Sequence, residues 1–238
     1  MATVSVLPVA PRLTRLAAAD LTAGTMRNWI TCGELPPGTR LPEEQLCEAL
    51  GVSRNTLREA FRLLGHERLV VHELNRGVFV RTLTAADVAD VFLVRELAEL
   101  AGVRAARSAD RALLRRVDEA VASGSAAARK RDWTAFATAD LAFHRALAAL
   151  AGSPRIDEMM RRVLAELRLA FGAVEDRAAF HAPYARRNAG LAELLHAGRL
   201  KPLERELRSY LADARDQIVA ALDRDIAREP DRDTAARP

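Results

Sequence analysis

The chain has 238 residues, a length that suits one large domain or two modest ones. Half of the residues are hydrophobic and 29% are charged, which supports a packed core and argues against wholesale disorder, while the net charge of +4 is too small to establish nucleic-acid binding. No apolar run is long enough to span a bilayer, no secretory signal pattern opens the chain, and Cys32 and Cys47 form no CxxC pair, so we expect a reducing, cytoplasmic location and no membrane.

Three helical patterns lie in the first third of the chain. Residues 1–12 contain two prolines and no helical period, and we expect them to form a flexible arm. Apolar residues at helical spacing then predict helices over residues 13–33, 42–50 and 53–65. A proline-stiffened connection follows the first helix, and a glycine-led turn joins the second to the third.

The third helix has a face suited to the DNA major groove. Ser53 is a good N-cap, Asn55 and Thr56 fall in the exposed first turn, and Arg54 and Arg58 share one face. Arginine pairs well with guanine, asparagine with adenine, and threonine with the thymine methyl group or a phosphate. On this segment alone, a solvated arginine face remains an equal alternative.

After the third helix, the spacing of apolar residues changes from that of a helix to that of a β-strand. Two β-branched runs, residues 69–73 and 78–81, are separated by turn residues and predict a hairpin. Three helices followed by a two-stranded ribbon make a winged helix-turn-helix over residues 13–82. Its wing tip carries Asn75, Arg76 and Gly77.

From Thr84 onward the pattern is helical, and residues 83–225 are expected to form a second domain with a disordered tail at residues 226–238. The expected helices are Ala85–Ala109, Arg111–Lys130, Trp133–Ala151, Pro154–Val174, Ala182–His196 and Lys201–Leu222. Short connections between six helices predict an antiparallel bundle. The predicted fold class is therefore mostly α: a winged helix-turn-helix followed by a six-helix bundle.

Polar residues on the apolar faces of this bundle are candidates for a binding site. Asp140 and His144 lie four residues apart on the inward face of one helix, where a carboxylate and an imidazole could hold one metal ion. For these two residues alone, a buried pair satisfied by hydrogen bonds is the better interpretation. Arg95 also faces inward and requires an anion, either Glu99 or an acidic ligand.

Residues 13–82 resemble the DNA-binding domain of the GntR family of bacterial transcription regulators. The resemblance is carried by Gly33-Glu34-Leu35-Pro36-Pro37-Gly38, Leu41-Pro42-Glu43, Leu50 through Ala60, Leu69-Val70 and Asn75 through Val80. It implies that Arg54, Asn55, Thr56 and Arg58 contact operator DNA, next to the capping Ser53, and that Asn75, Arg76 and Gly77 reach a groove from the wing. Many members carry a DNA-contacting arginine where this chain has Glu44, so we expect that contact to be lost or replaced by Arg40.

The second half resembles the FCD ligand-sensing domain of the FadR-type branch, and six helices suit its shorter, VanR-like form. Arg95 through Glu99, Asp140 through His144 and, more weakly, Asn188 through Leu195 carry this resemblance. Many such domains bind a divalent metal through an aspartate and three histidines, and the metal helps to hold a carboxylate effector. The aspartate and first histidine correspond to Asp140 and His144.

The other two ligand positions correspond to Asn188 and Tyr210. An amide and a phenol are weak ligands for zinc or nickel, so we expect no tight metal site. His181 or His196 would serve as a ligand only in a different helix register. A small polar or carboxylate effector would instead bind directly to Arg95, Asp140, His144, Asn188 and Tyr210.

The resulting hypothesis is a homodimeric, effector-responsive transcription regulator, a repressor rather than an enzyme. One alternative is an enzyme that uses Asp140 and His144 as a metal or acid–base site. The chain has no glycine-rich phosphate loop, no nucleophile elbow and only five histidines, which argues against this alternative. A second alternative, an architectural DNA binder without a ligand, leaves the large second half unexplained.

Overall fold

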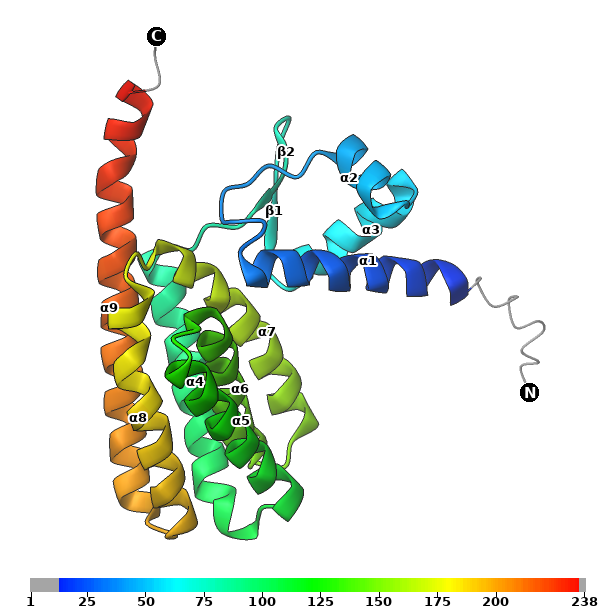
Figure 1. Cartoon of the computed structure of the whole chain (residues 1–238). Coiled ribbons are helices and arrows are strands. Elements are labelled where there is room, and N and C mark those ends of the chain that lie inside the picture. Colours follow the sequence, from blue (N-terminus) through cyan, green and yellow to red (C-terminus); the bar gives the residue numbers. More distant parts are fainter. Residues whose placement is uncertain (1–12, 236–238) are drawn as a thin grey trace, which may run out of the picture. The chain divides into compact units, whose positions relative to one another are not determined.

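The computed structural model describes residues 13–235 of the chain, and the side chains of residues 18–224 (Figure 1). The chain divides into two compact units, Met1–Arg81 and Thr82–Pro238. No helix within the described residues is both long and apolar enough to cross a membrane. The predicted arm at residues 1–12 lies outside the described residues.

The N-terminal unit is a winged helix-turn-helix. Its elements are α1 (Leu13–Cys32), α2 (Glu43–Leu50), α3 (Arg54–His66), β1 (Val70–Glu73) and β2 (Gly77–Val80). The strands pair antiparallel with Val70 opposite Val80, and α1 packs against α3. The fold class predicted from the sequence is confirmed for this unit.

Local sequence explains how α3 begins. Gly51 adopts a left-handed backbone conformation with φ of 63°, which glycine tolerates at no steric cost and which ends α2. Ser53 then caps α3, because its side-chain oxygen accepts a 3.2 Å hydrogen bond from the Thr56 amide. Leu57, Phe61 and Leu64 recur at helical spacing and are fully buried. The opposite face of α3 is therefore exposed to solvent.

The C-terminal unit is a bundle of six α-helices in the described part of the chain. They are α4 (Ala85–Ala105), α5 (Arg111–Arg129), α6 (Trp133–Ala149), α7 (Pro154–Ala170), α8 (Arg177–His196) and α9 (Leu200–Ala235), with short 3₁₀ turns after α4 and α7. Helix α4 packs against α6, α7 and α9 (Figure 1). The predicted six-helix bundle is thus confirmed.

A close approach of α4 to α6 depends on a glycine. A Cβ atom added to Gly102 would lie 1.9 Å from the carbonyl oxygen of Leu147, well inside van der Waals contact. The two helix backbones therefore touch at this point. This contact brings the inward faces of α4 and α6 together and positions their polar side chains.

Several helix ends differ from those expected from the sequence, and the start of α8 and the end of α9 differ most. Helix α8 begins at Arg177 and not at Ala182, because Asp176 caps it through a 2.8 Å bond from the Ala179 amide and Pro183 is accommodated inside the helix. Helix α9 continues to Ala235, whereas we expected it to end at Leu222 and a disordered tail to begin at residue 226. No glycine or proline occurs between residues 203 and 229, so the helix meets no stop signal. The last part of that predicted tail, residues 236–238, lies outside the described residues.

Candidate nucleic-acid interface and interior polar cluster

The N-terminal end of α3 exposes the polar side chains that the sequence predicted for DNA. The side chains of Arg54 and Arg58 are 67% and 63% exposed, and Asn55 is also exposed between them. The Thr56 hydroxyl lies 2.9 Å from the Ser53 hydroxyl, so both hydroxyls belong to the helix cap. The backbone amides of this helix end and its arginines form a cationic surface suited to phosphate and base edges.

Acidic side chains of α2 lie against these arginines. Arg58 Nε donates to both carboxylate oxygens of Glu43, at 3.0 and 3.1 Å. Arg54 lies 3.9 Å from Glu44, the residue at which the family resemblance would place an arginine. Exposed pairs of this kind contribute little stability, so a DNA phosphate can displace the acids at low cost.

The wing presents the second predicted group of contacts. Asn75 and Gly77 adopt left-handed conformations with φ of 62° and 108°, as a tight hairpin turn requires. Arg76 is exposed, pairs with Glu73 and lies 5.4 Å above the ring of Phe79.

Arg40 is placed beside this wing. Its backbone pairs with Phe79 in an isolated bridge, and its Nε atom lies 3.8 Å from a Cβ built on Gly77. Arg40 is exposed there. It can therefore add positive charge next to the wing, and its contact with DNA stays a prediction.

The interior of the bundle holds the third predicted group. Asp140 Oδ1 accepts two hydrogen bonds of 2.7 Å, one from the Asn188 side-chain amide and one from the Tyr210 hydroxyl. His144 Nε2 lies 3.8 Å from the same oxygen. Four residues from α6, α8 and α9 are thereby brought together in the core.

Arg95 and Glu99 extend this cluster from α4. His144 Nδ1 is 2.6 Å from Glu99 Oε2, and Arg95 Nε donates to Glu99 Oε1 at 3.0 Å. Arg95 is 2% exposed, and Glu99 and His144 are completely buried. Glu99, one of the two anions considered for Arg95 from the sequence, is thus its partner here. We refer to Arg95, Glu99, Asp140, His144, Asn188 and Tyr210 as the interior cluster.

The phenols of this region are held in their neutral form. Burial and the charge of Asp140 raise the pKa of Tyr210 well above its ordinary value. Burial likewise raises the pKa of Tyr184 to about 12. A neutral Tyr210 can donate to the Asp140 carboxylate, which is a favourable bond in a dry interior.

Several buried polar atoms beside these bonds have no hydrogen-bond partner: Arg95 Nη2, His144 Nε2, Asn188 Oδ1 and the Tyr184 hydroxyl. A cavity of about 10 Å³ lies in the same region, and its lining includes Arg95, Asp140, Tyr184 and Tyr210. That volume holds at most about one water molecule. Tyr184 was missed from the sequence, although it lies four residues before Asn188 on the same face of α8.

The two alternative metal ligands lie in other surroundings. His181 is buried among the rings of Phe136, Phe171 and Phe180, and burial lowers its pKa to about 4. His196 is at the surface, 2.6 Å from Asp118. Neither completes a set of ligands with Asp140 and His144.

Comparison with known proteins identifies both units. Residues 18–80 match the family described as bacterial regulatory proteins, gntR family, and residues 90–213, more than half of the chain, match the FCD domain. A structural-genomics crystal structure of a GntR transcriptional regulator from Rhodococcus sp. RHA1 is 44% identical, with a TM-score of 0.82, over 86% of this chain and 99% of that one. The chain belongs to the GntR family.

Curated GntR relatives agree with this identification. The galactonate operon transcriptional repressor of Escherichia coli is 28% identical over 219 residues, which cover 83% of this chain and 90% of that protein. The HTH-type transcriptional regulator YdhC of Bacillus subtilis is 37% identical over 70 residues, which cover 29% of this chain and only 31% of that protein. These relatives and the fold are those of transcription regulators and not of enzymes.

The interior cluster does not fit the metal that many FCD domains hold. No group of three or more histidine, cysteine, aspartate or glutamate side chains is placed to hold a metal ion among the described residues. Oδ1 of Asp140 is already occupied by two protein donors, Asn188 and Tyr210. An amide and a neutral phenol are poor replacements for imidazole around zinc or nickel.

Proposed function

We propose that this GntR protein is a homodimeric, sequence-specific repressor that acts in the cytoplasm and whose operator affinity is controlled by a small polar or carboxylate effector. The observation that carries the proposal is the combination of an exposed arginine-bearing helix end in one unit with a buried, incompletely satisfied polar cluster in the other. The first is suited to DNA, and the second to a small molecule. We propose no enzymatic activity, because Asp140 and His144 are engaged by protein partners in the core.

The DNA-binding role is assigned to the exposed residues of the winged unit. Arg54, Asn55 and Arg58 would read base edges and phosphates, while Ser53 and Thr56 fix the start of α3 and present backbone amides to a phosphate. The sugar-phosphate backbone of the DNA would be contacted from the wing and its neighbourhood by Arg40, Asn75, Arg76 and Gly77. Two such units, related by two-fold symmetry, would read a palindromic operator.

The effector role is assigned to Arg95, Asp140, His144, Asn188 and Tyr210. The names of relatives point to sugars and sugar acids: one is a galactonate operon repressor and another a D-xylose utilization operon repressor from Paenarthrobacter nicotinovorans. Effector binding changes operator affinity only if the effector prefers one arrangement of the protein, and such coupling is typically about 1–3 kcal/mol.

The two roles can be separated with two variants and one control. The operator is first selected from random duplex DNA with the wild-type protein. Arg54→Ala should weaken binding to this operator by roughly 10- to 100-fold, because one base-reading arginine is worth about 1–3 kcal/mol. Arg62→Ala removes an exposed arginine that pairs with Glu59 near the other end of α3, and should leave binding nearly unchanged.

Arg95→Met keeps the volume of a buried side chain and removes its charge. It should retain operator affinity and lose the response to D-galactonate or D-xylose, whichever releases the wild type. Full operator affinity in Arg54→Ala would contradict the role given to α3. An undiminished effector response in Arg95→Met would contradict the role given to the interior cluster.

A further inference from the structure

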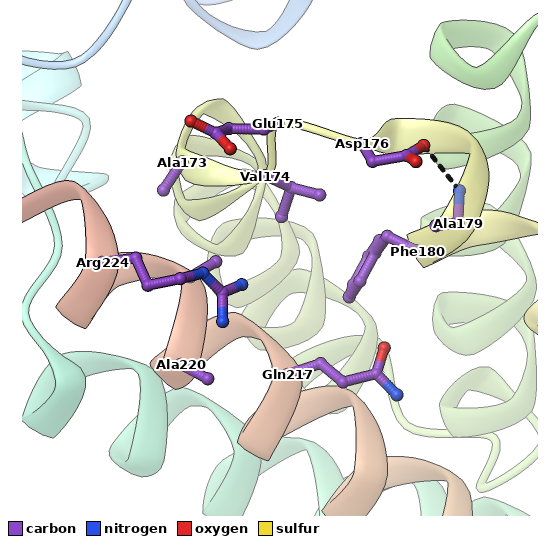
Figure 2. A pocket seen from close by; sticks show the side chains of 10 residues that line it. Ala173, Val174, Glu175, Asp176, Ala179, Phe180, Gln217, Ala220 and Arg224 are labelled. Atoms are coloured by element: carbon purple, nitrogen blue, oxygen red, sulfur yellow. Dashed lines mark hydrogen bonds between the residues drawn. The ribbon is translucent and has the colours of Figure 1, made fainter.

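A second, larger hollow lies next to the interior cluster. It has a volume of about 360 Å³ and lies between residues 173–180, which join α7 to α8, and the second half of α9. We call it the outer cleft, and it is large enough for a small-molecule site. Phe180 and Arg224 project into it from these two segments (Figure 2).

The outer cleft has polar as well as apolar walls. Gln217 and Arg224 line it from α9, and Glu175 and Asp176 line it from the segment just before α8. Within the part of the chain whose side chains are described, Arg224 makes no ion pair or hydrogen bond. A ligand with hydroxyl groups would find both donors and acceptors here.

Phe180 is common to the linings of the outer cleft and of the 10 Å³ inner cavity. Residues of α9 that line the two hollows alternate along the helix. Ala214 and Ile218 line the inner cavity, while Gln217 and Ala221 line the outer cleft. The two spaces are therefore neighbours along one helix. Displacement of the Phe180 ring would join them.

The inner cavity has the features of a binding site but not the volume. Arg95 and Tyr184 line it, and Arg95 Nη2 and the Tyr184 hydroxyl are buried without hydrogen-bond partners, which is unfavourable for polar groups away from water. A cavity of about 10 Å³ has no room for a ligand group larger than water. A larger ligand group can reach these atoms only if the cavity widens, and the outer cleft adjoins the cavity at Phe180.

Charge restricts what can bind at the inner end. Arg95 and Asp140 line the inner cavity, and the guanidinium of Arg95 is already paired with the carboxylate of Glu99. The inner end therefore offers no unpaired cation to a bare carboxylate. A hydroxyl group, by contrast, can accept from Arg95 Nη2 and donate to Asp140.

We propose that the inner cavity and the outer cleft are two ends of one site for a net-neutral, polyhydroxylated small molecule, with Phe180 closing the passage between them. The inference rests on the effector-sensing role proposed above and specifies its ligand and its entrance. The hydroxylated end of the ligand meets Arg95, Tyr184 and Asp140, and the remainder occupies the cleft beside Gln217 and Arg224.

The backbone around Phe180 favours such a movement. Phe180 lies in the first turn of α8, which starts at Arg177. Pro183 has no N–H to donate to the carbonyl of Ala179, so this turn lacks one of the hydrogen bonds that normally hold a helix together. A small shift of the turn can carry the Phe180 ring away from the rings of Phe171 and Tyr184, both of which it contacts at a tilt.

Access to the inner cavity can be measured without knowing the ligand. In the full-length chain, Cys32 and Cys47 are replaced by serine and Ala214, which lines the inner cavity only, by cysteine. The rate at which methyl methanethiosulfonate modifies Cys at position 214 then reports how often the cavity opens. Phe180→Ala should raise this rate by at least roughly tenfold, because it removes the barrier permanently.

Leu167→Ala is the matched control, since Leu167 lines the inner cavity but not the cleft and is 1% exposed. It enlarges the cavity without opening it and should change the rate by less than about twofold. Equal acceleration by both variants would mean general loosening of the bundle, and no acceleration by Phe180→Ala would mean another entrance. Either result would overturn the proposal that Phe180 closes a passage between the inner cavity and the outer cleft.

The ligand class is tested on the same cysteine. Glycerol, a neutral polyol, should slow its modification in Phe180→Ala more than sodium acetate does at equal concentration. Stronger protection by acetate, or no protection by either, would overturn the assignment of a net-neutral ligand. Operator binding by the wild type is measured separately, so failure of this site and failure of the regulator role give different results.

Discussion

The hydroxyl of Tyr210 donates a 2.7 Å hydrogen bond to Oδ1 of Asp140 in the interior of the helical unit. The Asn188 amide donates to the same oxygen at the same distance. These are the two positions at which the family resemblance would place histidine ligands. The carboxylate that would bind a metal is thus satisfied by the protein itself, and the helices α6, α8 and α9 are linked through it.

Metal retention should follow from these bonds. We expect the wild-type protein to keep no zinc or nickel after soaking and desalting, as measured by elemental mass spectrometry. The double variant Asn188→His, Tyr210→His would place three histidines beside Asp140 and should keep about one ion per chain. One ion per wild-type chain would show that Asn188 or another residue completes a metal site.

Gly102 should be essential to the packing of α4 on α6. Gly102→Ala places a methyl group 1.9 Å from the Leu147 carbonyl oxygen, so the helices must separate and stability should fall by roughly 1–3 kcal/mol. Gly190→Ala is the control, because a Cβ there meets nothing within 4 Å. In the interior of α8 it should stabilise by about 0.5–1 kcal/mol. Urea unfolding of both variants measures the difference, and equal effects would contradict this account of the contact.

His181 should make the helical unit less stable in acid. Burial lowers its pKa from 6.5 to about 4, so the unfolded chain binds a proton first as the pH falls. The folded state therefore loses stability between about pH 6.5 and pH 4, by about 3 kcal/mol at most, and no such loss occurs above pH 6.5.

The contribution of His181 can be separated from that of the carboxylates with His181→Gln. The variant should show a smaller decrease in the free energy of unfolding between pH 7.5 and pH 4.5 than the wild type, in urea titrations at each pH. Asp140 and the cations Arg168 and Arg177 face His181 in both proteins, so their effects cancel in the comparison. Parallel pH profiles would exclude His181 as the cause.

The proposed homodimer should depend on an exposed apolar strip of α4. Leu93 and Leu97 lie one turn apart and are 57% and 67% exposed, although large apolar side chains are usually covered. The double variant Leu93→Glu, Leu97→Glu should shift the protein from dimer to monomer in sedimentation equilibrium. Leu74→Glu, at the 90% exposed wing tip, should leave the oligomeric state unchanged. A dimer that survives the α4 variant would place the interface elsewhere.

The parts of this molecule that follow local rules could be predicted from the sequence. Ser53 caps α3, Leu57, Phe61 and Leu64 form its buried face, and the winged fold follows from the order of these elements. The inward placement of Asp140 and His144 also follows from helical spacing, since both share the face of Phe143.

The remaining features depend on side-chain contacts between distant segments. The start of α8 was misplaced because Pro183 was read as a boundary, whereas the Asp176 cap determines the first turn. Tyr184 lies inside the helix expected over Ala182–His196, but its sequence position alone did not single it out as part of the site. The pairing of Arg58 with Glu43 and the small volume of the inner cavity arise from packing, which periodicity does not describe.

The central claim is that the winged unit reads a specific DNA sequence. The most direct test is the ratio of two dissociation constants, for a duplex selected from a random pool and for a scrambled duplex of equal length, both measured at about 150 mM salt by fluorescence anisotropy. The account predicts a palindromic selected sequence and a preference of at least about 1,000-fold, reduced by Arg54→Ala. Equal affinity for both duplexes, or no enriched sequence in the pool, would contradict it.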